Sequence, residues 1–263
     1  MTKLVVCGAL GRMGRTILRL SLEYSDLEVV AGVEHPDCVK SPDLGEATGI
    51  GELKGKPLTS RLEEVLPLCD VVVEFSGNTL AAVSHTKLTA LAKKAVVIGT
   101  TGFSHEEVEE IRSYSFYAPV LLSPNMSLGV NLLFRLTQIA LQALKDKNFD
   151  VEILEIHHRF KKDAPSGTAL RLEEIVKEVM GIERSVHGRE GICPREQEVG
   201  TMALRGGDVV GEHTVFFFGF GERLELTHRA TSRDIFAKGA LEACRWIKDK
   251  EPGFYTMFDV LGI

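Results

Sequence analysis

The sequence predicts an α/β fold in which a doubly wound parallel sheet is followed by a second α+β domain with a mixed or antiparallel sheet. Two observations predict this fold class. Up to about residue 125, short runs of Val, Ile and Leu alternate with helical patterns, as in strands buried on both faces of a parallel sheet. Beyond that point, strand-like segments follow one another with a single helix among them, which favours antiparallel pairing.

The N-terminal half contains five apolar segments that we expect to be strands and three segments that we expect to be helices. The strands are predicted over residues 3–8, 28–34, 71–76, 95–102 and 119–125. The helices are predicted over residues 12–24, 79–93 and 105–114. Each helix lies between two strands, which is the arrangement of a parallel sheet with crossover connections.

The C-terminal half begins with a long predicted helix over residues 128–145. Strands are predicted over residues 151–159, 198–205, 209–218 and 222–230, with helices over 168–180 and 235–248. We therefore expect a first domain over residues 1–126 and a second domain over residues 127–234. The C-terminal residues 235–263 are expected to return to the first domain.

Composition excludes several classes of protein. The chain has 263 residues, with 31 Lys and Arg against 37 Asp and Glu, so its net charge of −6 does not favour binding to nucleic acid or to a membrane surface. No run approaches the roughly 18 apolar residues of a membrane span. We expect no signal peptide, because the first apolar run meets Gly8 at once.

The chain contains five widely spaced cysteines and no C-x-x-C pair. This pattern favours reduced thiols in a cytoplasmic protein over disulfides or structural zinc. Cys7 lies in an apolar predicted strand and is interpreted as a core residue. We expect no metal site, because the adjacent His157 and His158 would point to opposite faces of a strand.

A glycine-rich turn follows the first predicted strand. Residues 8–14 read GALGRMG, a G-x-x-G-x-x-G variant of the dinucleotide fingerprint of Rossmann-type domains. Glycine permits the tight turn and lets backbone amides approach a pyrophosphate, whose charge is attracted by the N-terminus of the next helix. The residues expected to bind the cofactor here are Gly8, Ala9, Leu10, Gly11, Arg12 and Met13.

An acidic residue completes this pattern. Glu34 lies 20 residues beyond Gly14, at the end of the second strand, where its carboxylate would accept the ribose hydroxyls of NAD. The alternative is a structural turn with a solvated glutamate. Arg12 and His35 could meet the 2′-phosphate of NADP, so we expect use of NADH and NADPH with a preference for NADH.

A second group of polar residues lies in the C-terminal half. Residues 155–169 read EIHHRFKKDAPSGTA, and the small residues Ser166, Gly167 and Thr168 open a predicted helix. Free amides at a helix start, beside histidine and lysine, suit a dianionic substrate. Three simpler explanations stay open: an ordinary helix cap, one core histidine with one surface histidine, and a solvated basic turn.

These motifs resemble the 4-hydroxy-tetrahydrodipicolinate reductase (dihydrodipicolinate reductase) family of diaminopimelate and lysine biosynthesis. The matching segments are VVCGALGRMGR, VIGTTGFS, SPNMSLGVNLL, EIHHRFKKDAPSGTA and RGGDVVGEHTVFFFGFGERLELTHRATSR. They run in order from about residue 4 to residue 233. The HHR-x-K-x-DAPSGTA pattern is highly specific for the family, whereas the glycine loop is not.

The resemblance implies a homotetramer that reduces a cyclic imine dicarboxylate with NADH or NADPH. Residues 1–126 would be its dinucleotide-binding domain, and residues 127–234 its substrate-binding and oligomerisation domain. It implies that His157 is the general acid and that Lys161 is a second proton donor or charge stabiliser. His158, Ser166, Gly167 and Thr168 would hold the substrate carboxylates. The cofactor would be lined near its nicotinamide by Gly99, Thr100, Thr101, Ser123, Pro124, Asn125 and Met126.

Two departures from the family pattern bear on the cofactor. His35 stands where members that use NADPH well often have arginine, and Met126 stands where an aromatic residue is common. Two alternative functions stay open. One is another two-domain dehydrogenase of amino-acid metabolism, and the other is a dinucleotide-sensing protein without catalysis. A sensor would not need a proton donor such as His157 beside an anion site.

Overall fold

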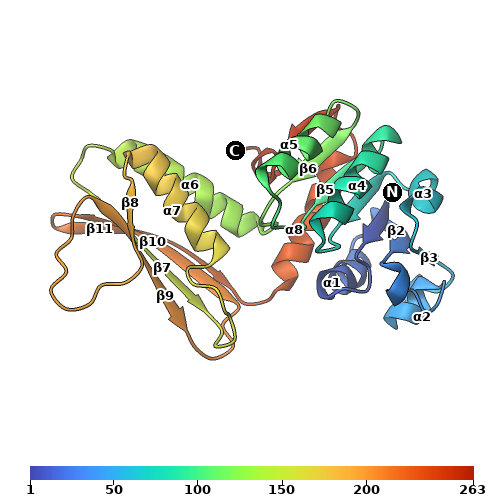
Figure 1. Ribbon diagram of the computed structural model, residues 1–263, viewed down its shortest axis with the longest axis horizontal. Coiled ribbons are helices and arrows are strands. Elements are labelled where there is room, and N and C mark those ends of the chain that lie inside the picture. Colours follow the sequence, from blue (N-terminus) through green and yellow to red (C-terminus); the bar gives the residue numbers. More distant parts are fainter. The chain divides into compact units, whose positions relative to one another are not determined.

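The computed structural model describes residues 1–263 and divides into two compact units (Figure 1). The first unit comprises Met1–Ser127 and Asp234–Ile263, and the second comprises Leu128–Arg233. The boundaries predicted from the sequence were 126/127 and 234/235. The chain therefore passes between the units twice, and its C-terminal segment belongs with the N-terminal unit.

The first unit is built on a seven-stranded sheet in which every strand pair is parallel, with the order β12-β6-β5-β4-β1-β2-β3. The strand order reverses between β1 and β4, which is where sheets of this kind bind ligands at their carboxyl edge. Apolar strands with both faces buried make up its centre. The strands are β1 (Thr2–Cys7), β2 (Leu27–Val33), β3 (Leu58–Thr59), β4 (Val71–Glu74), β5 (Ala95–Ile98), β6 (Pro119–Leu122) and β12 (Gly253–Tyr255).

Helices connect these strands and cover the sheet. The α-helices are α1 (Arg12–Ser21), α2 (Leu44–Thr48), α3 (Leu62–Val65), α4 (Thr79–Leu91), α5 (His105–Tyr114), α8 (Asp234–Ile247) and α9 (Met257–Leu261). Three 3₁₀ turns lie at Pro36–Cys38, Gly51–Leu53 and Leu66–Leu68. Helix α8 packs against α1 and β5, although it follows them by more than a hundred residues (Figure 1). The predicted doubly wound sheet is confirmed.

The second unit is a mixed five-stranded sheet with two helices on one face (Figure 1). Strand β10 pairs antiparallel with β11 and β7, whereas β9 pairs parallel with β7 and β8. Its elements are α6 (Leu128–Leu144), β7 (Asp150–His157), α7 (Gly167–Met180), β8 (Arg184–Val186), β9 (Glu198–Arg205), β10 (Gly211–Gly219) and β11 (Glu222–Ala230). The predicted second α+β domain is therefore confirmed as a fold.

Several predicted boundaries were wrong. The strands predicted to end at residues 76, 102 and 125 end at Glu74, Ile98 and Leu122, and the residues beyond them form loops at the carboxyl edge of the sheet. The small elements between residues 36 and 68, together with β8, β12 and α9, were not predicted. Each of them has only two to five residues, which is too short for a periodic apolar pattern to emerge.

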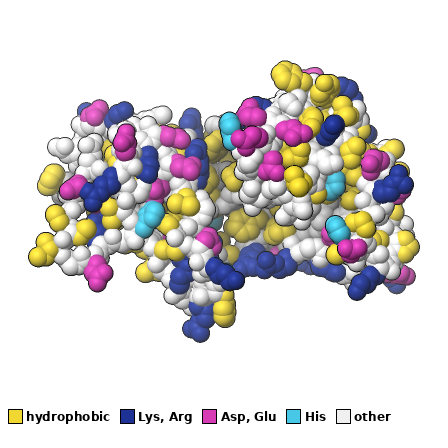
Figure 2. Space-filling model, in the orientation of Figure 1, with side chains coloured by type: hydrophobic (Ala, Val, Ile, Leu, Met, Phe, Trp, Pro, Cys, Tyr) yellow, Lys and Arg dark blue, Asp and Glu magenta, His cyan; other side chains and the backbone are white.

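The surface carries charges of both signs. Figure 2 shows Lys and Arg side chains interspersed with Asp and Glu on the face in view, with apolar side chains between them. No helix of the chain is both long and apolar enough to cross a membrane. Cys7 is fully buried within β1, as predicted for a core residue.

Candidate active site

The glycine loop connects β1 to α1 at the carboxyl edge of the first unit's sheet. Gly8 has a φ of +77°, and a Cβ atom there would lie 2.4 Å from the Phe75 carbonyl oxygen. A Cβ atom on Gly14 would lie 2.0 Å from the Gly8 carbonyl oxygen, so glycine is required where helix and strand meet. Gly11 caps α1 without a side-chain hydrogen bond, which leaves the first amides of the helix available to an anion.

Glu34 lies directly beside this loop. Its carboxylate accepts hydrogen bonds from the backbone amides of Leu10 and His35, both at 2.9 Å. These two bonds fix the carboxylate at the exit of β2, next to the turn that the glycines form. Arg12 follows the last residue of the turn, His35 follows Glu34, and both side chains are exposed. The Asp37 carboxylate lies 3.6 Å from the His35 imidazole.

A small pocket lies at the same edge. It measures about 270 Å³ and is lined by Met13, Phe75, Gly99, Pro124, Asn125, Met126 and Phe236. Five of these residues were predicted from the sequence to bind the cofactor, and the structure brings them together from the first turn of α1 and the loops after β5 and β6. Helix α8 packs closely against the last loop, because a Cβ atom on Gly239 would lie 1.8 Å from the Met126 carbonyl oxygen.

The other predicted cofactor residues at this edge do not line the pocket. Thr100 and Ser123 are buried, and the Ser123 hydroxyl donates to the Asn125 carbonyl at 2.8 Å. Thr101 is exposed. Sequence analysis missed the two aromatic residues of the pocket. Phe75 could have been found because it directly follows a central strand, whereas nothing in the sequence places Phe236 here.

In the second unit, His157 is the last residue of β7 and is buried with 8% exposure. Its Nδ1 atom lies 2.5 Å from the Glu155 carboxylate, so Nδ1 carries the proton that this bond requires. Burial lowers the pKa of His157, although the Glu155 carboxylate opposes that change. The imidazole is therefore held in one orientation and can release a proton readily from Nε2.

Glu155 is a fully buried carboxylate that connects three groups: the His157 imidazole, the Arg205 guanidinium and the Ser166 backbone amide. Both terminal nitrogens of Arg205 donate to it at 2.8 and 2.7 Å, and the Ser166 backbone amide donates at 3.0 Å. Burial by itself would raise the pKa of Glu155, but the hydrogen bonds from Arg205 and His157 outweigh burial and keep that pKa below its usual range. The predicted proton donor and the start of α7 thus share one ionised carboxylate.

Ser166 caps α7, and its hydroxyl oxygen accepts from the Ala169 amide at 3.2 Å. The hydroxyl also lies 3.0 Å from Nε2 of His213, which is buried. Burial lowers the pKa of His213 to about 3, so this histidine is neutral. Gly167 and Thr168 form the first turn of the helix. The helix-cap explanation is correct, and the cap stands in the same cluster as His157.

Lys161 and His158 lie on the loop that follows β7. The Lys161 ammonium pairs with both oxygens of the Asp163 carboxylate, at 2.9 and 2.8 Å. His158 is only partly buried, and its Nε2 atom lies 3.2 Å from the Arg233 guanidinium. The strand ends at His157, so the two histidines differ in burial because one belongs to the sheet and the other to the loop.

Sequence analysis missed the residues that hold this cluster in place. Glu155 could have been found, because residues two apart on a strand share a face. Arg205 and His213 belong to β9 and β10, and only the pairing of those strands with β7 brings them here.

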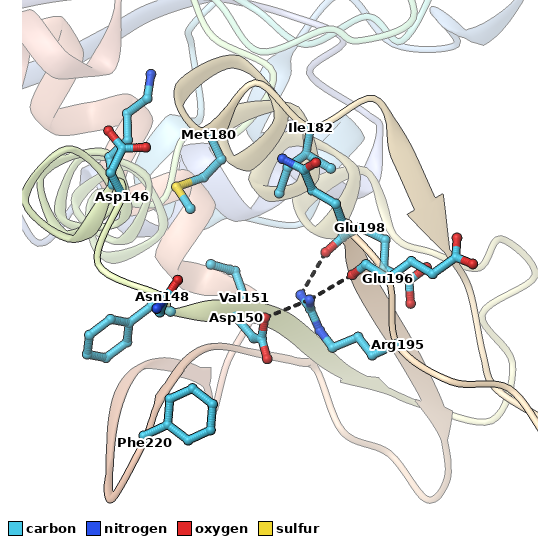
Figure 3. Close-up of a pocket in the computed structure, with 13 residues that line it drawn as sticks. Asp146, Asn148, Asp150, Val151, Met180, Ile182, Arg195, Glu196, Glu198 and Phe220 are labelled. Atoms are coloured by element: carbon cyan, nitrogen blue, oxygen red, sulfur yellow. Dashed lines mark hydrogen bonds and ion pairs between the residues drawn. The ribbon is translucent and has the colours of Figure 1, made fainter.

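A larger pocket in this unit, of about 580 Å³, lies at the opposite end of β7 (Figure 3). Strand β7 begins at Asp150 and ends at His157, so about 20 Å separates this pocket from the cluster. Arg195 lies in the pocket and pairs with Asp150 at 2.7 Å, as Figure 3 shows. Two basic and four acidic side chains line it, so it is not suited to an anionic substrate, and it contains none of the predicted site residues.

Comparison with known proteins gives consistent results. The family model described as dihydrodipicolinate reductase, N-terminus, matches residues 2–126, and the model for the C-terminus of the same family matches residues 129–261. The chain is 71% identical over 262 residues to a 4-hydroxy-tetrahydrodipicolinate reductase of Aquifex aeolicus (strain VF5), covering 99% of each chain. It is 46% identical over 270 residues to the reductase of the same name from Myxococcus xanthus (strain DK1622), covering 100% of this chain and 98% of that one.

Solved structures agree with this fold. A dipicolinate-bound dihydrodipicolinate reductase from Paenisporosarcina sp. TG-14 superimposes with a TM-score of 0.81 at 22% identity, covering 98% of each chain. A scyllo-inositol dehydrogenase from Lactobacillus casei, with bound NAD(H), gives a TM-score of 0.60 at 13% identity, covering 99% of this chain and 93% of that one. At these identities, the likeness concerns the fold.

Proposed function

The chain belongs to the dihydrodipicolinate reductase family, and we infer that it reduces 4-hydroxy-tetrahydrodipicolinate with a nicotinamide cofactor in diaminopimelate and lysine biosynthesis. One structural observation supports the proposed chemical reaction. A single buried carboxylate, Glu155, binds both the imidazole of His157 and the amide that opens the anion-binding end of α7. A proton donor is thus built into the place where a carboxylate substrate would bind.

The first unit has the features that a dinucleotide requires. The uncapped start of α1 would receive the pyrophosphate, and the Glu34 carboxylate would accept the ribose hydroxyls. The pocket around Gly99, Asn125 and Met126 would take the nicotinamide. Thr100 and Ser123 would support that pocket from beneath. When bound, the cofactor supplies the hydride.

NADH is the preferred cofactor in this proposal. The Glu34 carboxylate is held at the ribose position by two backbone amides, and it would repel a 2′-phosphate. His35 is exposed beside the Asp37 carboxylate, so it provides little positive charge for that phosphate. Arg12 is the remaining exposed cation, which is why NADPH is still expected to bind, although more weakly.

The substrate would bind to the second unit. The amides of Gly167 and Thr168 and the hydroxyls of Ser166 and Thr168 lie at the positive end of a 14-residue helix, which would hold one carboxylate. His158 and Lys161 would face the other anionic groups of the ring. Fixing both carboxylates orients the ring for hydride transfer.

His157 would donate the proton that balances the hydride. Its Nδ1–H is held by Glu155, so only Nε2 can give a proton to the ring. A Cβ atom on Gly211 would lie 2.9 Å from Nε2, which means that glycine keeps this side of the imidazole open. Lys161 would stabilise the negative charge that develops on the ring, or act as a second donor.

A homotetramer in the cytoplasm is also part of the proposal. Helices α6 and α7 cover one face of the five-stranded sheet (Figure 1). Leu204 and Phe218 lie on the other face, where their side chains are 51% and 37% exposed. Exposed apolar side chains on a sheet support self-association. Five free cysteines suit a reducing compartment. Sedimentation of the purified protein would test the assembly.

The decisive experiment is to follow NADH and NADPH oxidation by nicotinamide absorbance. The substrate would be generated from pyruvate and aspartate semialdehyde by the synthase that forms it. We expect rapid oxidation that depends on substrate and is faster with NADH at limiting cofactor. A folded protein that binds NADH but oxidises neither cofactor would contradict the proposed reaction.

A further inference from the structure

A second buried carboxylate lies under the cofactor pocket of the first unit. Glu74 is the last residue of β4 and is fully buried. One of its oxygens accepts from the Ser76 backbone amide at 2.7 Å and from the Thr100 hydroxyl at 3.2 Å. Its other oxygen lies 2.6 Å from Nδ1 of His85 on α4. The proposed chemistry does not use this carboxylate directly, although it stands within the cofactor-binding edge.

Glu74 is ionised in spite of its burial. Burial by itself would raise its pKa, but the hydrogen bonds and charge of His85, together with the bonds from Ser76, outweigh burial and hold that pKa below its usual range. An ionised carboxylate is tolerated inside a protein only when its oxygens are well satisfied. The donors around Glu74 therefore form a fixed set rather than an interchangeable one.

Two of these partners, Ser76 and Thr100, belong to the loops that form the pocket. The Thr100 hydroxyl also accepts from the Gly77 amide at 3.1 Å, so Glu74 and Thr100 together join the loop after β4 to the loop after β5. The Gly99 amide donates to the Glu74 carbonyl at 2.9 Å. Phe75 and Gly99 then meet in the pocket, where a Cβ atom on Gly99 would lie 2.0 Å from the Phe75 ring.

We propose that Glu74 is a positioning residue for the nicotinamide half of the cofactor, acting by joining the loops after β4 and β5 into one rigid wall. The proposal rests on the function inferred above. The atoms of Cys7, Glu74 and His85 lie within 4.8 Å of one another, which also suggests a metal site. However, burial raises the pKa of the Cys7 thiol, and a protonated thiol is a poor metal ligand.

The test compares two ligands in Glu74→Ala by titration calorimetry. In the proposed site, NADH would fill both halves, whereas ADP would contact only the glycine loop and Glu34. We expect NADH to bind about 10- to 100-fold more weakly, because the substitution removes hydrogen bonds to a charged group, and ADP to bind within about twofold of wild type. Glu74→Gln should retain most NADH affinity, since its amide oxygen can accept from Ser76 and Thr100.

Val73→Ala is the matched control. Val73 is fully buried on the same strand, and its side chain points to the other face of the sheet. Val73→Ala should lower the melting temperature of the protein without changing the ratio of NADH to ADP affinity. Thr100→Val provides a second variant, because it removes the hydroxyl that joins Glu74 to Gly77 and retains the side chain's shape. It should weaken NADH and leave ADP unchanged even if Glu74→Ala fails to fold.

Two results would overturn the proposal. One is wild-type NADH affinity in Glu74→Ala or in Thr100→Val. The other is an equal loss of NADH and ADP affinity, which would show a merely structural role. Failure of the proposed reaction would be seen separately, as absence of substrate-dependent NADH oxidation by the wild-type protein.

Discussion

Replacing Glu155 with glutamine should change the pH dependence of turnover. The carboxylate binds His157, Arg205 and the Ser166 amide, and the amide group of glutamine cannot accept from all of them. Because Glu155 opposes the effect of burial on His157, its removal lowers the pKa of the imidazole further. A general acid works only when protonated. The decline of kcat on the alkaline side should therefore begin at a lower pH in Glu155→Gln.

The size of this effect follows from the contact. A hydrogen bond to a charged group contributes about 1.5–3 kcal/mol, and about 1.4 kcal/mol corresponds to a factor of ten. The fraction of protonated His157 should fall about 10- to 100-fold at a pH above its pKa, and kcat should fall in proportion. Loss of the Arg205 partner should also lower the free energy of unfolding, by about 3–5 kcal/mol, since a buried pair is broken.

The assay is kcat for NADH oxidation across a pH series, together with urea unfolding. Glu173→Gln is the matched control, because Glu173 is another buried carboxylate of the second unit and its side-chain partners are Ser185, His187 and Thr201. The control should lose stability and keep the wild-type pH profile. An unchanged alkaline limb in Glu155→Gln would refute the argument that Glu155 sets the protonation of His157.

Three further substitutions test other parts of the site. Lys161→Ala should lower kcat about 100-fold, the usual contribution of a proton donor, while the exposed neighbour Lys162→Ala should not; near-normal turnover would show that Lys161 is a surface residue. Glu34→Ala should weaken NADH about tenfold in a binding titration and NADPH less, because only NADH has the free 2′-hydroxyl; equal losses would exclude Glu34 from the ribose site. Gly14→Ala places a Cβ atom 2.0 Å from the Gly8 carbonyl oxygen, so it should lower the free energy of unfolding by about 1–3 kcal/mol and impair NADH binding. Wild-type affinity in that variant would mean that the loop tolerates a shift of α1.

Residues that act through local chain geometry could be predicted from the sequence. The glycines at 8, 11 and 14 are separated by short, regular spacings, and each spacing corresponds to a turn or a helix start that needs glycine. The segment around His157 and Ser166 is similarly compact, so its histidine, lysine and helix cap were recognisable together. The ends of β4, β5 and β6 were predicted two to four residues too late. Only Phe75 continues an apolar run, whereas residues 99–102 and 123–125 are Gly, Thr, Ser, Pro and Asn and form loops.

The sequence by itself determined the order of the longer strands and helices, the glycine loop, and the chemistry of the groups in both halves of the chain. These features depend on residues that are close together, where periodicity and turn preferences act. Only the tertiary structure decided which distant groups support them. Arg205 and His213 reach Glu155 and Ser166 through strand pairing, and Phe236 reaches the cofactor pocket because the chain's last long helix returns to the first unit. The physical reason is that a buried carboxylate must be satisfied by whatever donors the packed strands bring near it, and no local pattern records which donors those are.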